Sequence, residues 1–411
     1  MDEAVRDNPI ETKHFAAREL ARFVRWDYFP VAFIGRLPFA MTIVGVLTLV
    51  AGVRGSIADA GLAAASAGIA TAIFGTMSGG LADRFGQRWV LLSCSALNAC
   101  AMLLFVWLSY SPVPAWGLAV GAALVGASVP QVGPFSRSRM AAFAGALGHP
   151  RRDRALSMVM SYESVADEAS FVLGPVLVGL LASLIAPWAP LVVAAAVTAS
   201  VVVAFATHPS AIASTPSHAA RSAPPGRLFT RQIMLLVVAM FLVGGIFGST
   251  LTALTAFMHV FAAESQTGIL YGAMSVGAIL SALGVAALPA RFTVASRWLV
   301  FSAIAVLGVA AILLATTIVS MAVALFITGI GVGAVLVSLF TLGSRSAMAG
   351  RSTVVLTMLQ SSLTVGQALV TAAVGLLVEA SGAHSGFLIT AGVAAALTLL
   401  AVAGRRQFGI R

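Results

Sequence analysis

The sequence predicts an all-α integral membrane protein with twelve transmembrane helices in two lobes of six, and three observations support this fold class. Of the 411 residues, 59% are hydrophobic and only 9% are charged, so a soluble domain could not keep this much apolar surface from water. The apolar residues fall into twelve runs, and a spanning helix needs about 20 apolar residues. A single long hydrophilic stretch divides the chain into two halves of similar length.

The twelve runs follow one another with short connections, of which the shortest lie around Pro187 and Thr317. Each run is therefore expected to cross the bilayer as one helix, and consecutive helices to run in opposite directions. In chain order, the spans are expected near residues 29–53, 57–81, 89–109, 114–136, 156–186, 189–207, 233–258, 266–288, 298–316, 319–342, 353–379 and 385–403.

The segments outside the spans complete the predicted organisation. Residues 1–28 form a cytoplasmic segment, in which apolar residues from Glu11 to Tyr28 recur with arginines between them. This pattern predicts a helix on the inner membrane surface, with a frayed tail as the alternative. Residues 208–232, rich in Pro, Ser and Ala, form the expected cytoplasmic linker between lobes at 29–207 and 233–404, and a cytoplasmic tail follows at 405–411.

The distribution of basic residues predicts the orientation in the membrane. Of the 24 basic residues, Arg36 lies inside a span and Arg54 in an external loop, while the other 22 fall in the tails or in alternate loops. Lys and Arg stay on the cytoplasmic side, so both termini are expected there. The net charge of +10 is then an orientation signal, and no nucleic-acid partner is expected.

The residue usage and the first residues bear on localisation. Heavy use of Ala, Val and Arg with a single lysine, Lys13, indicates a bacterium with a GC-rich genome, and we expect a multi-pass protein of the bacterial inner membrane. The first residues lack a basic start followed by a short apolar core, so no cleaved signal is expected.

Several kinds of chemistry are not expected. Cys94 and Cys100 are six residues apart on one predicted helix and point about 120° away from each other, which excludes a disulfide between them. The sequence has no metal-ligand cluster and no pair of nucleophile and base. We therefore predict no enzyme activity, no cofactor and no metal.

One connection between spans carries a motif. Residues 79–90 read Gly-Gly-Leu-Ala-Asp-Arg-Phe-Gly-Gln-Arg-Trp-Val, and their charges cannot lie in hydrocarbon. The stretch resembles the signature of the major facilitator superfamily, G-x-L-a-D-r-x-G-r-k, found in the cytoplasmic loop between helices 2 and 3. In the second half, the corresponding loop at Pro289–Phe292 lacks the acid and the glycines.

The resemblance implies a cytoplasmic gate. The carboxylate of Asp83 is expected to face the N-terminus of span eleven, near Ser352 and Thr353, when the transporter opens outward. This places an anion at a positive helix end. A solvated turn is the alternative, and the other residues expected in the gate are Gly79, Arg84, Gly86 and Arg88.

Four ionisable residues lie inside predicted spans, where they are costly and indicate function. Glu163 and Asp167 share one helix face, whereas Glu168 is rotated by about 140° from Glu163 and is expected to point into its own lobe. Arg36 and Glu163 lie about 10 Å inside their spans, which allows an ion pair at matched depth.

These acids are candidates for proton coupling. Two carboxyls close together in low dielectric resist being ionised at once, so one favours its protonated form, and approach or retreat of Arg36 would then load and release the proton. The proton-coupling candidates are Glu163, Asp167, Glu168 and Arg36. The alternatives are a fixed structural ion pair and direct contact of an acid with a cationic substrate.

Residues 170–179 resemble the fifth-helix pattern of proton-driven exporters of the superfamily, G-x-x-x-G-P-x-x-G-G. Gly174, Pro175 and Gly179 match, while Ser170 and Val178 depart from the pattern. Pro175 permits a bend, and the small residues are expected to pack closely against the other lobe. A packing kink alone would give the same pattern.

Two departures from those exporters stand out. They usually carry an arginine in the membrane part of span four, but Trp116 to Gln131 contains none, and Arg137 and Arg139 are expected only at its cytoplasmic end. Such exporters often have an acid in span one, where this chain has Arg36. Their usual proton relay therefore does not carry over to this chain.

A polar stripe follows one face of span eleven. Polar residues in a membrane helix face protein or water, so the stripe is expected at the lobe interface or on a cavity wall, with plain interhelical hydrogen bonding as the alternative. The residues are Thr357, Gln360, Thr364, Gln367 and Thr371.

The sequence thus predicts a monomeric secondary transporter, embedded in membrane lipid, that works by alternating access. The leading hypothesis is proton-coupled export of small apolar or cationic molecules, with protons as the coupling ion. A narrow-substrate transporter of a sugar or other metabolite is the second. An integral membrane enzyme or a receptor scaffold without transport is a third, from a different class.

Overall fold

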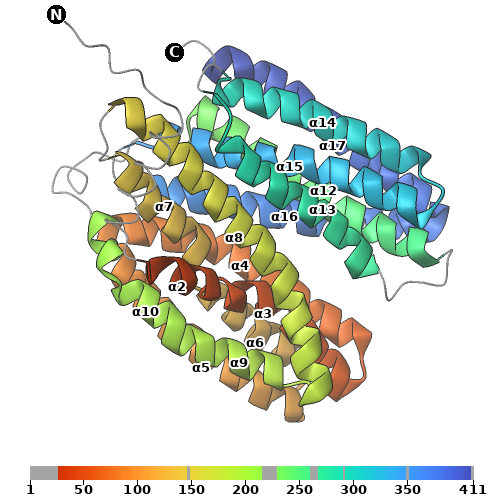
Figure 1. The fold of residues 1–411 in the computed structure, drawn as a ribbon. Coiled ribbons are helices and arrows are strands. Elements are labelled where there is room, and N and C mark those ends of the chain that lie inside the picture. The colour runs from red at the N-terminus through yellow and green to blue at the C-terminus, as the bar shows by residue number, and fades with distance from the viewer. Residues whose placement is uncertain are drawn as a thin grey trace, which may run out of the picture.

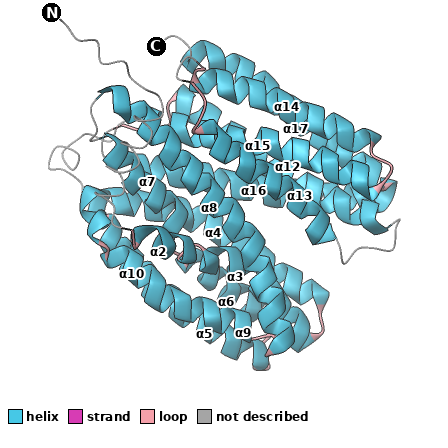
Figure 2. Cartoon of the chain, viewed as in Figure 1, coloured by secondary structure: helices cyan, strands magenta, loops and turns pink. Residues whose placement is uncertain are grey.

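A computed structural model of the chain describes residues 26–145, 149–214, 229–259, 267–289, 292–348 and 351–408. Within these residues every regular element is a helix (Figure 2). The predicted interfacial helix at 11–28 lies almost entirely outside the described residues, as do most of the linker and the end of the tail.

The first lobe comprises the helices up to η2. Long apolar runs make its helices, and charged or proline-containing turns end them. They are α2 (Tyr28–Ile34), α3 (Leu37–Arg54), α4 (Ile57–Phe85), α5 (Gln87–Tyr110), α6 (Ala115–Ser128), α7 (Val132–Gly145), α8 (His149–Leu184), α9 (Ala189–Val197), η1 (Thr198–Val202), α10 (Val203–Thr207) and η2 (Pro209–Ser214).

The second lobe lies beside the first, and the two are drawn from red to yellow-green and from green to blue in Figure 1. Its helices are α12 (Arg231–His259), α13 (Thr267–Val285), α14 (Val294–Leu314), α15 (Ile318–Ser346), α16 (Ser352–Ser381) and α17 (Ala383–Phe408). Between the lobes, α4 and α7 pack on α16, and α8 packs on α13 and α15.

The predicted spans are present as helices. Among the described residues, eleven helical stretches are long and apolar enough to cross a membrane, and the shorter apolar helix at Ile269–Val285 supplies the twelfth. The all-α membrane fold expected from hydropathy is confirmed. Arg54, the basic residue of an expected external loop, donates from Nε to the Ser109 carbonyl at 2.9 Å and so caps the end of α5.

Two of the spans are broken, which hydropathy did not predict. Span one divides into α2 and α3 at Gly35 and Arg36, and span four divides into α6 and α7 at Val129, Pro130 and Gln131. Pro130 lacks an N–H and disfavours helix in the residue before it, which explains the second break. The residues of this second break are apolar or uncharged, so the run of hydropathy continues through it.

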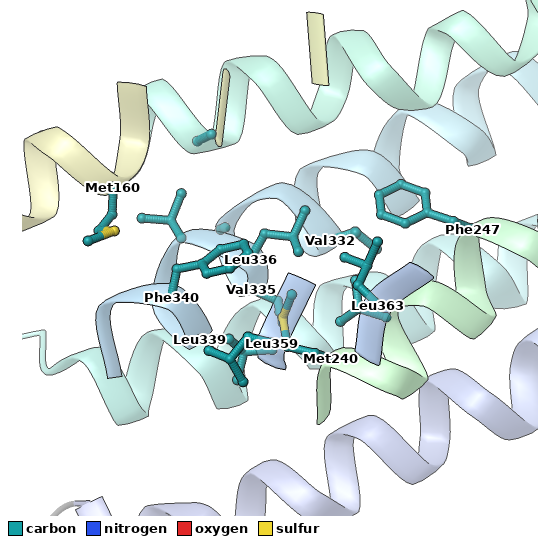
Figure 3. Close-up of a cluster of buried hydrophobic side chains, with 14 of the residues drawn as sticks. Met160, Met240, Phe247, Val332, Val335, Leu336, Leu339, Phe340, Leu359 and Leu363 are labelled. Atoms are coloured by element: carbon teal, nitrogen blue, oxygen red, sulfur yellow. The ribbon is translucent and has the colours of Figure 1, made fainter. Parts of the chain in front are cut away.

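A hydrophobic cluster joins the lobes on one side of this interface (Figure 3). Met160 of α8 lies in the same buried cluster as Phe340 and Leu336 of α15. Leu359 and Leu363 of α16 belong to it as well. The lobes therefore share an apolar contact that excludes water around the polar groups described next.

Candidate transport site and gate

Arg36 lies at the centre of a buried set of charges. It occupies the break between α2 and α3, so its side chain is not directed by a continuous helix. Its Nε donates to Asp167 Oδ1 at 2.8 Å, its Nη2 donates to Glu163 Oε2, and its Nη1 donates to the Ala32 carbonyl at 2.7 Å. The ion pair between spans one and five that matched depth allowed is present.

Arg137 completes this set, because the helix of span four continues to Gly145, beyond the expected end of the span at residue 136. The break before α7 carries it into the protein, where it is buried and its Nη2 donates to Asp167 Oδ2 at 2.6 Å. Its guanidinium stacks on the ring of Phe340, in α15 of the other lobe, 3.7 Å from the ring centroid. We call Arg36, Arg137, Glu163 and Asp167 the charge quartet.

Every carboxylate oxygen of the charge quartet has a hydrogen-bond donor. The fourth oxygen, Glu163 Oε1, accepts from Ser136 Oγ at 2.7 Å, and Ser136 Oγ lies 2.6 Å from the Tyr28 hydroxyl. A buried ion pair is tolerated when its remaining lone pairs are satisfied in this way. Glu163 is fully buried, whereas Asp167 is 15% exposed.

Arg139 is also buried in α7, but it serves a separate structural purpose. Its Nε donates to Gln87 Oε1 at 2.9 Å, and its Nη1 donates to the Phe205 carbonyl at 2.8 Å. The guanidinium stacks on the ring of Phe205. It therefore ties α7 to α5 and α10 within the first lobe.

Glu168 takes no part in the hydrogen bonds and ion pairs of the charge quartet. It is 6% exposed and lies close enough to Tyr271 of α13 for their charges to interact, across the contact between α8 and α13. Its charged and polar neighbours come from both lobes, since Asp167 and Arg137 belong to its own lobe and Tyr271 to the second. The expectation that it points into its own lobe stays a prediction. Among the described residues, no hydrogen bond or ion pair involves its carboxyl.

A cavity lies between the lobes next to the charge quartet. Its volume is about 30 Å³, and Arg36 and Asp167 line it together with the amides of Gln131 and Gln360. Phe39 and Phe171 also line it, with ring centroids 6.1 Å apart and planes inclined at 78°. The cavity therefore combines one partly exposed acid, two amides and an aromatic wall.

The fifth-helix motif contributes to this cavity only at its start. Ser170 lines the cavity, and its hydroxyl donates to the Ala166 carbonyl at 2.6 Å. A Cβ on Gly174 would lie 2.7 Å from the Cβ of Ala40 in α3, so this glycine permits close packing within the first lobe, contrary to the expected contact with the other lobe. Pro175 lies inside α8, which continues through it, and a Cβ on Gly179 would meet nothing within 4 Å.

Asp83 closes the interface at the predicted cytoplasmic side. Its Oδ1 and Oδ2 accept from the backbone N–H groups of Thr353 at 3.2 Å and of Val354 at 2.8 Å, in the first turn of α16. Free N–H groups and the helix dipole both favour an anion at this position. The structure thus shows the contact that the resemblance implied for Asp83, and we call it the Asp83 latch.

The neighbours of Asp83 divide into those that touch α16 and those that do not. A Cβ on Gly79 would collide with the Thr357 side chain, so only glycine permits this approach of α4 to α16. Gly86 has a φ of 91° and makes the turn between α4 and α5. Arg84 and Arg88 are exposed and lie over the rings of the aromatic residues that follow them in the chain, Phe85 and Trp89. Neither arginine makes a hydrogen bond or ion pair with the described part of α16.

Two polar residues that sequence reasoning missed reinforce the latch. Gln87 Nε2 donates to Thr353 Oγ1 at 3.1 Å, and Ser138 Oγ lies 2.8 Å from the same atom and 3.0 Å from Ser352 Oγ. Gln87 stands within the motif, so its place was available from the sequence. Ser138 was not, because the break before α7 decides where it points.

The five residues of the polar stripe in span eleven lie in three different environments. Gln360 lines the cavity, Thr357 is buried against Gly79, and Thr364 donates to the Gln360 carbonyl at 3.1 Å. Gln367 and Thr371 lie where α16 approaches Gly248 of α12. Of the five, only Gln360 reaches the cavity.

Three solved structures with a similar arrangement of helices are described as transporters. A bacterial homologue of the iron transporter ferroportin, in an outward-facing state with soaked iron, has a TM-score of 0.73 at 15% identity and covers 93% of this chain and 98% of its own. The E. coli fucose:proton symporter FucP has a TM-score of 0.64 at 15% identity, with coverage of 91% and 98%. The proton:xylose symporter XylE has a TM-score of 0.69 at 13% identity, with coverage of 94% and 96%. At these identities the likeness shows the fold.

The family is shown by sequence. A search of curated protein sequences gives no match. The family model described as Major Facilitator Superfamily matches residues 28–362, which include the charge quartet, the cavity and the Asp83 latch. This chain belongs to the major facilitator superfamily.

Proposed function

We propose that this protein is a secondary active transporter that exports small apolar or cationic compounds in exchange for protons by alternating access. The observation that supports this most is the cavity between the lobes, where an aromatic wall of Phe39 and Phe171 faces the partly exposed carboxylate of Asp167. A cation with an apolar body fits such a surface through charge and ring contact.

The closed side of the interface supports alternating access. The Asp83 latch and the Ser138 contacts hold the lobes together at the predicted cytoplasmic end. Rocking of the lobes would break these contacts and open the cavity to the other side. The cavity would thereby exchange its contents between the two faces of the membrane.

A second candidate is narrow transport of a sugar or other polar metabolite. The amides of Gln131 and Gln360 lie on the cavity wall and provide both donors and acceptors. A polar uncharged substrate would use these amides, whereas an apolar cation would leave them unpaired.

Bacteria without their own exporters provide the test, with a panel of cationic dyes followed in the presence and absence of a proton uncoupler. We expect the wild type to lower dye accumulation only while the proton gradient stands, and Asp167→Asn to lose this effect. Asp59→Asn makes the same acid-to-amide change at the first turn of α4, away from the cavity, and should behave as the wild type.

Failure to affect any dye despite good membrane expression would contradict broad export. Transport of a sugar or metabolite by purified protein in vesicles would then favour the second candidate. Movement of no compound at all would favour a membrane enzyme or scaffold.

A further inference from the structure

The charge quartet is neutral and its two carboxylates are fully hydrogen-bonded, whereas Nε and Nη1 of Arg137 have no hydrogen-bond partner among the described residues. Two guanidinium groups face two carboxylates, and each of the four carboxylate oxygens accepts a hydrogen bond from Arg36, Arg137 or Ser136. Protonation of Glu163 or Asp167 would leave a buried guanidinium without its partner, which is strongly unfavourable. Both acids are thus paired with guanidinium groups in this structure, which disfavours either of them as the proton carrier.

Glu168 is a third buried carboxyl beside the two guanidinium groups of the charge quartet, and among the described residues it makes no ion pair. It lies about midway along the membrane stretch Ala155–Leu184, and its side chain is nine-tenths buried. Isolated carboxylates are costly in low dielectric, so a group in this position is held neutral by a bound proton.

The groups that face Glu168 include one positive charge, that of Arg137, which also pairs with Asp167. On its own lobe these are Asp167, which precedes it, and Arg137, whose guanidinium is already engaged by Asp167 and by the Phe340 ring. On α13 it is Tyr271, whose hydroxyl lies 3.4 Å from the Phe247 carbonyl and donates to it. Arg36, at the break before α3, is engaged by the other two acids.

Glu168 lies between the lobes and close to the cavity. The helix α8 packs on α13 of the second lobe, so the surroundings of Glu168 change when the lobes rock. Phe171, three residues further along α8, lines the cavity, and side chains three apart are neighbours on a helix. The carboxyl is therefore one helical turn from space that a proton can enter.

We propose that Glu168 is the proton-binding site of this transporter, loaded while the Asp83 latch is closed and unloaded when α8 and α13 move apart, and that Glu163 and Asp167 are positioning residues. This inference rests on the proposed function, because it assigns the coupling ion of that transport cycle to one carboxyl. It replaces Glu163 and Asp167 as the expected coupling groups.

Infrared difference spectroscopy tests the site without a transported substrate. The purified protein is reconstituted in vesicles of phosphatidylethanolamine and phosphatidylglycerol, and the C=O stretch of protonated carboxyls is recorded at neutral pH. We expect Glu168→Gln to lose the intensity of one protonated carboxyl relative to the wild type. Asp167→Asn should lose none, because both of its carboxylate oxygens are paired with guanidinium groups.

Thermal stability gives a second readout of the same assignment. Gln mimics a protonated Glu, so Glu168→Gln should have the same melting temperature as the wild type. Glu163→Gln removes a charge from the charge quartet, so its melting temperature should be lower than that of the wild type. The assignment is overturned if Glu168→Gln leaves the carboxyl band unchanged, or if it melts as low as Glu163→Gln.

A transport assay separates this inference from the proposed function. With ethidium as probe, Glu168→Gln should lose gradient-driven efflux but retain exchange of ethidium across the membrane. If the rate of ethidium efflux by the wild type does not depend on the proton gradient, proton-coupled export is contradicted, whatever the infrared carboxyl band shows. Wild-type efflux that follows the gradient, unchanged in Glu168→Gln, would contradict the assignment of Glu168 alone.

Discussion

Replacement of Asp83 by asparagine should open the predicted cytoplasmic side by a measurable amount. The carboxylate accepts from Val354 N at 2.8 Å and from Thr353 N at 3.2 Å. Asn keeps one uncharged oxygen, so one hydrogen bond is lost and the other loses its charge assistance. A hydrogen bond to a charged group contributes about 1.5–3 kcal/mol, and a charge at a partly buried helix end up to about 2 kcal/mol.

The combined loss is about 2–3 kcal/mol, after allowance for the bond that Asn retains. Since about 1.4 kcal/mol changes an equilibrium constant tenfold, the open population should rise about 30- to 150-fold. The wild type, held closed by the Asp83 latch, provides the reference.

A buried cysteine reports this population. Thr357 is fully buried against Gly79, inside the latch, so a Thr357→Cys side chain reacts only when the lobes separate. Cys94 and Cys100 are replaced by alanine in every variant. The rate of reaction with a membrane-impermeant maleimide, added at the predicted cytoplasmic side, should rise by the same factor in Asp83→Asn.

The matched control is Asp59→Asn, the same change at the opposite end of α4. Its labelling rate should equal that of the reference. If Asp83→Asn labels no faster than Asp59→Asn, the two hydrogen bonds to α16 do not hold the lobes closed, and the reasoning is refuted.

Three further predictions concern the gate and the charge quartet. Gly79→Ala should prevent full closure of the lobes and raise the labelling rate of Thr357→Cys, because its Cβ collides with the Thr357 side chain position in α16. Gly80→Ala is the control, since its Cβ lies 3.8 Å from the nearest neighbour and should leave the rate unchanged. Equal labelling rates in the two variants would contradict the assigned contact. Arg36→Ala leaves Glu163 and Asp167 without their common partner and should lower the free energy of unfolding by about 3–5 kcal/mol. The loss should appear as a lower melting temperature in detergent. A melting temperature like that of the wild type would show that the two acids are neutral. Ser138→Cys with Ser352→Cys, at hydroxyls 3.0 Å apart, should form a disulfide that stops dye efflux until reductant is added; efflux that persists after oxidation would show that this side need not open.

The fold and the latch could be predicted because their signals are local. Hydropathy runs identify spans without any tertiary information, and the charges around Asp83 mark a turn outside hydrocarbon. The contact with α16 then followed from the resemblance and from the preference of an anion for a helix N-terminus. Nothing in this reasoning required the packing of the lobes.

The charge quartet could be predicted only in part, because two of its features depend on geometry. Arg36 and Glu163 were paired from their depth in the membrane, but Arg137 enters only through the break at Val129, Pro130 and Gln131. A proline alone does not identify such a break, since Pro175 lies inside a continuous helix.

The surroundings of the Glu168 side chain also could not be predicted from the sequence. Helical rotation separates it from Glu163 but does not say which element covers that face of α8. The packing of α8 on α13 decides this, and no local signal in either segment reports it.

The partner of Asp83 has a consequence for how the second half of this protein can vary. The carboxylate binds the backbone N–H groups of Thr353 and Val354, which every residue except proline supplies. The second lobe can therefore change its side chains at Val354 without losing the contact, whereas the first lobe must keep an acid at Asp83. Mutational tolerance across the latch is thus unequal: one side is restricted to a single chemistry, and the other needs only a helix that begins at the right place.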